Sequence, residues 1–186
     1  MKKLYTMLAM MLMALAFASC ETDEDIAYTL EGTWKGNMHI NSEWDGRYYN
    51  TTYSEITFLK DPYSYSSGTG YWVDYYYSDA PWDYVANHIE WTVKYGDIEI
   101  YFVEERTTMI IRNYHLYRGR FTGTIYDSGN VVDFDLYQTS HPNYNSYRWG
   151  YSGWGYNAYY SRSMNKADGK ATAPAAPRRF VNPEAK

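Results

Sequence analysis

The chain has 186 residues with 22 acidic and 17 basic side chains, a net charge of -5 and a single cysteine. One cysteine excludes a disulfide framework and a metal cluster built from thiolates, and the acidic balance is the opposite of the basic face that nucleic-acid binding needs. The 24 tyrosines and 7 tryptophans are also unusual, because such rings favour both β-strands and binding surfaces.

The N-terminus has the pattern of a secretory signal. Lys2 and Lys3 give a positive start, residues 8–17 are apolar, and small residues stand before Cys20. The apolar stretch is shorter than the roughly 20 residues that cross a bilayer. We therefore expect a signal peptide over residues 1–19.

The segment Phe17-Ala18-Ser19-Cys20 resembles the lipobox of bacterial lipoproteins, with Phe17 where leucine is more usual. The resemblance implies that Cys20 carries acyl chains such as palmitate, becomes the first residue of the mature protein and anchors it in the outer membrane. The alternative is an ordinary signal peptide followed by an incidental cysteine.

An acidic stretch, Glu21-Thr22-Asp23-Glu24-Asp25, follows the cysteine. It has nothing apolar to bury, so we expect residues 20–27 to form a solvated tether. The stretch equally resembles the acidic export signal of some Gram-negative lipoproteins, which would place the protein on the outer surface of the cell.

Residues 28–140 consist of alternating apolar and polar segments separated by turn residues, with no helical period. Eight antiparallel strands are predicted, over residues 30–40, 48–59, 68–77, 88–95, 98–103, 107–116, 120–126 and 131–137. Short connections favour an eight-stranded up-and-down barrel, because closure removes the exposed strand edges. A β-sandwich is the alternative, since loop length alone does not fix closure.

The C-terminal part differs in composition. Residues 141–160 are rich in Tyr, Trp and Gly, and we expect them to pack on the barrel, across one end. Residues 161–186 are expected to be a disordered tail. Residues 20–140 hold 8 basic against 20 acidic side chains, whereas residues 141–186 hold 7 against 2. The basic part could therefore contact the acidic body, an anionic lipid surface or an acidic glycan.

Gly32-Thr33-Trp34 resembles the Gly-x-Trp signature of lipocalins, in which the Trp closes the base of the barrel. Residues 20–160 as a whole resemble lipocalin-like lipoproteins of Gram-negative gut anaerobes, whose activity is not known. The segments that carry this resemblance are Gly68-Thr69-Gly70-Tyr71, Ile89-Glu90-Trp91-Thr92-Val93 and Phe121-Thr122-Gly123. It implies a barrel fold and a place in the cell envelope.

Motifs for catalysis are missing. The sequence has no His-Glu-x-x-His, no phosphate-binding glycine loop and no Gly-x-Ser-x-Gly elbow. The histidines His39, His88, His115 and His141 are not at metal-ligand spacing, Glu104-Glu105 is expected in a turn, and Asp133 and Asp135 are expected on the outer face of the last strand. We therefore predict a protein without catalytic activity, cofactor or metal.

Aromatic side chains are the one candidate binding feature. The predicted ligand-binding residues at one barrel mouth are Tyr71, Trp72, Tyr75, Tyr77, Trp82 and Trp91. Such rings would suit a small apolar or sugar-like ligand. The alternative is that they only pack the barrel, and that the protein is a structural or accessory interaction partner in the outer membrane. The identity of a protein partner does not follow from the sequence.

Overall fold

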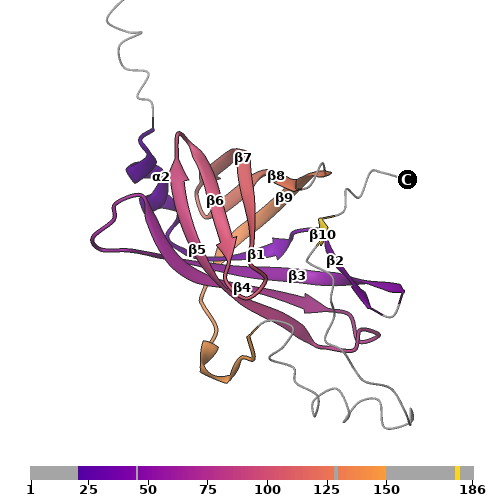
Figure 1. Cartoon of the computed structure of the whole chain (residues 1–186). Helices are drawn as coiled ribbons and strands as arrows, with labels where there is room; N and C mark the ends of the chain where they lie inside the picture. The colour runs from indigo at the N-terminus through magenta and orange to yellow at the C-terminus, as the bar shows by residue number, and fades with distance from the viewer. Residues whose placement is uncertain (1–20, 45, 128–129, 150–178, 181–186) are drawn as a thin grey trace, which may run out of the picture.

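A computed structural model describes residues 21–44, 46–127, 130–149 and 179–180. The strands are β1 (Gly32–Asn37), β2 (Ile40–Trp44), β3 (Arg47–Lys60), β4 (Ser67–Tyr76), β5 (Tyr84–Lys94), β6 (Asp97–Phe102), β7 (Thr107–Tyr117), β8 (Arg120–Asp127), β9 (Asn130–Thr139) and β10 (Arg179–Phe180). Helix α2 (Asp23–Leu30) precedes them, and a 3-10 turn, η1 (Tyr144–Ser146), follows β9. Figure 1 shows their arrangement.

Eight strands close into an antiparallel up-and-down barrel in the order β1-β9-β8-β7-β6-β5-β4-β3, and β3 pairs with β1 to complete it. This confirms the predicted barrel over the β-sandwich. β2 lies outside the closed ring: it pairs with the first residues of β3, and β10 pairs with β2. Of the predicted tail, Arg179–Phe180 is therefore a strand, and the rest lies outside the described residues.

The predicted first strand over residues 30–40 is wrong at both ends. Leu30 belongs to α2, and the strand breaks before β2 at His39, whose φ is 51°. The backbone N–H of His39 donates to Asn37 Oδ1 at 2.7 Å, which stabilises this bend. One expected strand is thus β1 and β2 in different parts of the sheet.

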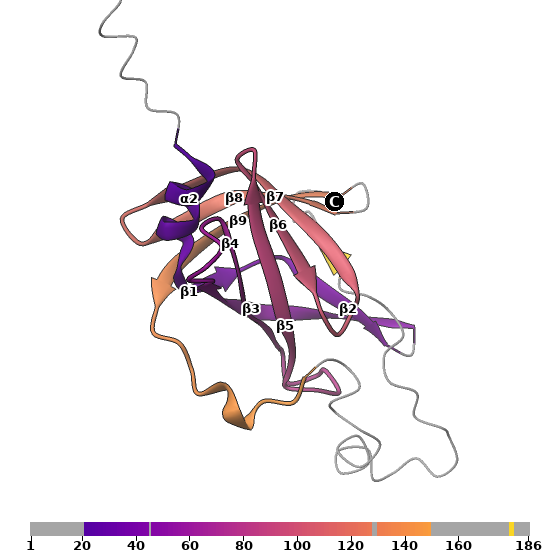
Figure 2. The same cartoon turned by 60° about the vertical axis from the view of Figure 1, so that its left-hand side comes forward.

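Helix α2 replaces most of the expected tether. Thr22 and Asp25 form a capping box that starts the helix. Its apolar residues Ile26, Ala27 and Leu30 are buried in the core. The prediction of a solvated tether is therefore wrong over residues 23–27, because these three residues share one face of a helix that the core can bury. Figures 1 and 2 show α2 packed at one end of the barrel.

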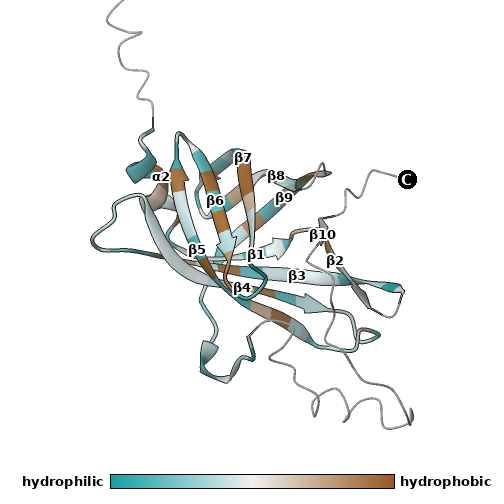
Figure 3. Cartoon of the chain, viewed as in Figure 1, coloured by the Kyte–Doolittle hydropathy of each residue, from teal (hydrophilic) through white to brown (hydrophobic). Residues whose placement is uncertain are grey.

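The barrel interior at the α2 end is apolar. Side chains from all eight strands and α2 form one buried cluster, and Figure 3 shows apolar residues alternating with polar ones along β6 and β7. Trp34 donates its Nε1–H to the carbonyl of Leu30 at 2.8 Å and meets Phe121 edge to face, with ring centroids 5.5 Å apart. Each large side chain buried in this way contributes roughly 1.5–3 kcal/mol to stability.

Candidate functional site

The structure does not bring the six predicted site residues together at one mouth. Trp72 and Trp91 point into the core, while Tyr71 and Tyr75 are half-buried on the outer face of β4. Trp82 belongs to a separate buried cluster with Tyr76, Ala80 and Val85, and Tyr77 is exposed. The side chains of neighbouring strand residues point to opposite faces, so a run of aromatic residues along one strand is divided between inside and outside.

Residues 141–149 cover the outer face of β4 and β5 rather than a barrel end. The Tyr144 ring stacks on Tyr71 with centroids 4.3 Å apart, and its hydroxyl lies 2.5 Å from Thr57 Oγ1. The hydroxyls of Tyr147 and Tyr75 are also hydrogen-bonded. Burial raises the pKa of Tyr144 to about 12, and it raises the pKa of Tyr75 further. Residues 150–160 lie outside the described residues.

His88 is held by structural contacts on the same face. Its Nδ1 lies 2.6 Å from Glu104 Oε1, and its backbone N–H donates to the other oxygen of Glu104 at 2.8 Å. The ring of Trp149 lies 3.9 Å from the imidazole. Over the described residues, no group of three or more His, Cys, Asp or Glu side chains could hold a metal ion.

The interior becomes polar away from α2. Asp74 is fully buried, and its Oδ1 accepts hydrogen bonds from Ser54 Oγ at 2.6 Å and from Trp72 Nε1 at 2.7 Å. Asn87, also fully buried, donates to Glu105 at 2.9 Å. Within the described part of the chain its Oδ1 has no hydrogen-bond partner. These polar groups mark the end of the barrel opposite α2.

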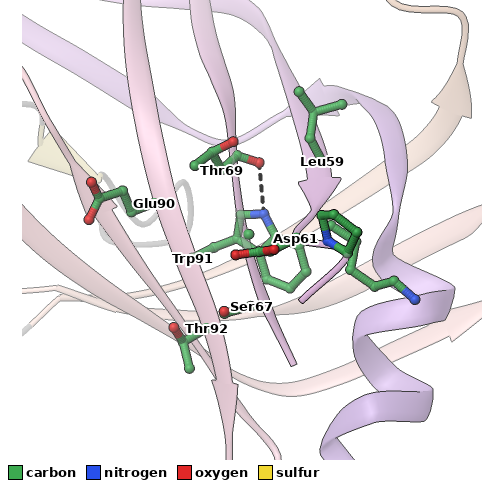
Figure 4. Close-up of a pocket in the computed structure, with 10 residues that line it drawn as sticks. Leu59, Asp61, Ser67, Thr69, Glu90, Trp91 and Thr92 are labelled. Carbon is green, nitrogen blue, oxygen red and sulfur yellow. Dashed lines mark hydrogen bonds between the residues drawn. The ribbon is translucent and has the colours of Figure 1, made fainter. Parts of the chain in front are cut away.

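A pocket of about 430 Å³ lies between the β3–β4 connection and β5. Its lining combines two carboxylates, one lysine, three hydroxyls and a few apolar groups: Leu59, Lys60, Asp61, Pro62, Ser67, Gly68, Thr69, Glu90, Trp91 and Thr92. Figure 4 shows Asp61, Ser67 and Thr69 near the Trp91 indole, with Thr92 beside it on β5. The volume lies within the roughly 300–1,000 Å³ of small-molecule sites.

The antiparallel register builds this pocket. Ser67 faces Thr92 and Thr69 faces Glu90 across the β4–β5 pair. The indole of Trp91 is fixed because its Nε1–H donates to the Thr69 carbonyl at 2.9 Å, and only 2% of Trp91 is exposed. It therefore supports the pocket without offering an open ring face, and ligand recognition would come from the carboxylates and hydroxyls.

Of the six predicted site residues, only Trp91 lines the pocket. Asp61, Thr69 and Glu90 also line the pocket, and aromatic character, the basis of the predicted site, does not distinguish them. The β4–β5 register is what places them together, because β5 begins at Tyr84 opposite Tyr75 and Thr69 then faces Glu90. The predicted bounds, paired end to end, would have placed Thr69 opposite residue 96 instead.

No helix in the described ranges is long and apolar enough to cross a bilayer. In comparisons with known proteins, the chain matches no family model, no curated protein and no solved structure.

Proposed function

We propose that the protein is an outer-membrane lipoprotein, anchored through acylated Cys20, whose barrel binds a small sugar-like ligand. The observation that carries the ligand proposal is the pocket beside Trp91, with Asp61 and Glu90 among its lining residues. Carboxylates and hydroxyls in an open pocket suit a ligand that presents several hydroxyl groups, because hydrogen bonds to charged groups are the stronger ones.

The structure offers less support for a small apolar ligand than for a sugar-like one. The large apolar side chains of the interior, among them Trp34, Phe58 and Phe121, contact one another in a single buried cluster. A ligand that replaced them would have to break close packing. A polar ligand in the outer pocket requires no such change.

Titration with mono- and oligosaccharides, followed by native mass spectrometry, tests the proposal on the mature chain carrying Cys20→Ser. Asp61→Asn and Glu90→Gln should each weaken binding by roughly tenfold, since a hydrogen bond to a charged group contributes about 1.5–3 kcal/mol. Glu99→Gln is the matched control, because Glu99 is exposed on β6, outside the pocket. Equal affinities in all three variants would reject the pocket as the site.

A second candidate is a non-catalytic accessory protein of the outer membrane with a packed barrel. The specific observation in its favour is the same apolar cluster, which reaches from α2 to residues of every barrel strand. The titration separates the two functions: a chain that stays unliganded with every saccharide, while folded, would favour the accessory role.

A further inference from the structure

The α2 end of the barrel carries a group of exposed tyrosines. Three barrel turns, β3–β4, β5–β6 and β7–β8, meet at this end beside α2 (Figure 2). Each of these elements presents at least one ring to solvent: Tyr28 is 70% exposed, Tyr63 91%, Tyr65 65%, Tyr95 90% and Tyr117 55%. We call these five residues the tyrosine face.

The opposite end has fewer large exposed rings. There the exposed tyrosines of the described chain are Tyr48 and Tyr77, at 55% and 57%. The excess at the α2 end is not explained by strand propensity, because Tyr63, Tyr65 and Tyr95 lie in connections and Tyr28 lies in a helix. A group of exposed rings of this kind marks a contact surface.

One of the five tyrosines, Tyr95, has a strained backbone conformation. It occupies the first position of a two-residue hairpin turn with a φ of 54°, followed by Gly96 at 81°. Such turns favour Asn, Asp or Gly, because a positive φ is strained for a bulky residue. The ring gains little packing in return, since it is 90% exposed.

Cations accompany three of the rings. Lys60 Nζ lies 5.0 Å from the Tyr28 ring centre, Lys94 Nζ lies 5.6 Å from that of Tyr95, and the Arg118 guanidinium lies 4.9 Å from that of Tyr117. Tyrosine rings and long basic side chains together suit the headgroup layer of a bilayer, which is apolar on one side and wet on the other.

Carboxylates at the same end bear on which headgroup charge the tyrosine face would suit. Of those on α2, the Asp23 carboxylate accepts hydrogen bonds from the β5–β6 turn, and the Asp25 carboxylate accepts them from Thr22. Asp97 pairs with Arg112, while Glu24 and Glu31 are exposed. With both signs present, the face fits a zwitterionic surface better than a strongly anionic one.

We infer that the tyrosine face is a lipid-binding surface, which seats the barrel end-on against zwitterionic headgroups. The inference rests partly on the proposed anchor, because only Glu21 and Thr22 separate Cys20 from the docked helix. That short link spans at most about 10 Å, so an acyl chain on Cys20 would bring this end of the barrel to the membrane.

Vesicles of phosphatidylcholine and phosphatidylethanolamine test the face separately from acylation. The mature chain carrying Cys20→Ser has no acyl chain, and its partition onto vesicles is measured by flotation. The triple variant Tyr63→Ser, Tyr95→Asn, Tyr117→Ser should partition roughly tenfold less, because interfacial binding scales with the apolar area inserted. The control Tyr48→Ser, Tyr77→Ser should equal the parent. Equal partition of the triple variant and the control would overturn the inference.

A second measurement applies if the unacylated parent partitions too weakly to quantify. A His-tag in place of residues 1–20 tethers the chain, which then contains no cysteine, to vesicles that contain a nickel-chelating lipid. A dye on Tyr63→Cys is then compared with one on Tyr77→Cys, using nitroxide-labelled lipids as quenchers. Strong quenching at residue 63, lost when Tyr95→Asn and Tyr117→Ser are added, supports the face, whereas quenching that ignores these changes contradicts it. Neither measurement depends on whether Cys20 is acylated in the cell.

Discussion

The carboxylate of Asp23 accepts a hydrogen bond from the backbone N–H of Gly96 at 2.8 Å and another from the N–H of Tyr95 at 3.0 Å. Two residues 73 positions apart are thereby joined, and α2 is fixed across the β5–β6 turn. The contact makes the helix part of the barrel rather than a flexible leader.

Asp23→Ala should lower the free energy of unfolding by about 2 kcal/mol, because two hydrogen bonds to a charged group are lost. Urea denaturation followed by tryptophan fluorescence measures the change. Glu24→Gln is the control, since Glu24 is exposed in the same helical turn, and it should stay within about 0.5 kcal/mol of the parent. Equal stability of the two variants would mean that α2 is not held by this contact.

Gly70→Ala should destabilise the barrel by about 3 kcal/mol or prevent folding, as overpacking of a rigid site does. A Cβ at residue 70 would lie 1.9 Å from the carbonyl oxygen of Thr57, which is backbone and cannot rotate away. Thr69→Ala, at an exposed neighbouring position, serves as the control. A well-folded Gly70→Ala protein would contradict the β3–β4 register.

Stability should fall as the pH rises above 10. Burial raises the pKa of both Tyr114 and Tyr144 to about 12 from an ordinary value of 10. Between these values the unfolded chain has released protons that the folded chain still holds, so unfolding is favoured as the pH rises. Urea midpoints at pH 9 and pH 11.5 measure the loss. Tyr114→Phe and Tyr144→Phe should each reduce it, whereas Tyr63→Phe, at a 91% exposed ring, should not.

Tyr95→Asn should raise the free energy of unfolding by about 0.5–1 kcal/mol, because asparagine tolerates the positive φ better. The gain in stability would accompany the loss of vesicle binding expected of the tyrosine face. Tyr95→Phe keeps the ring and should leave stability unchanged. A destabilised Tyr95→Asn protein would show that the ring stabilises the turn after all.

Cys20→Ala should release the protein from membranes, because the variant cannot be acylated. Lipoproteins carry several acyl chains, and the several chains together give stable attachment, whereas a single chain binds only marginally. Cell fractionation with a carbonate wash, together with the intact mass of the purified protein, measures this. A variant that remains in the washed membrane pellet would show that another part of the chain supplies the anchor.

Much of the barrel could be predicted because its signals are local. Alternation located seven of the strands to within a few residues. The glycines Gly96 and Gly119 lie at positive φ in the β5–β6 and β7–β8 turns, as expected of turn residues. Helix α2 was missed since its acidic composition masked the spacing of Ile26, Ala27 and Leu30. The bend at His39 was missed because nothing nearby in the sequence requires a left-handed residue.

The pocket could not be predicted from residue type alone. It depends on which residues face each other across β4 and β5, and on a β3–β4 connection whose Ser66 carbonyl accepts from the Val93 N–H at 2.7 Å. Aromatic content favoured β4 as the binding site. In the structure the rings of β4 pack on both faces of the strand, Trp72 in the core and Tyr71 against Tyr144 outside. The polar residues beside Trp91 form a pocket only because the β4–β5 register brings them together.

Two stretches of strand edge remain outside the pairing that closes the barrel, and Trp149 and Arg179–Phe180 each contact one of them. β5 continues over Tyr84–His88 beyond its described pairing with β6, and there Ala86 forms a bridge with Trp149. On the other side, β2 stands outside the ring and pairs with Arg179–Phe180. An unpaired edge is a template for a strand of another molecule. Trp149 and Arg179–Phe180 thus occupy positions at which a strand of another molecule could otherwise pair.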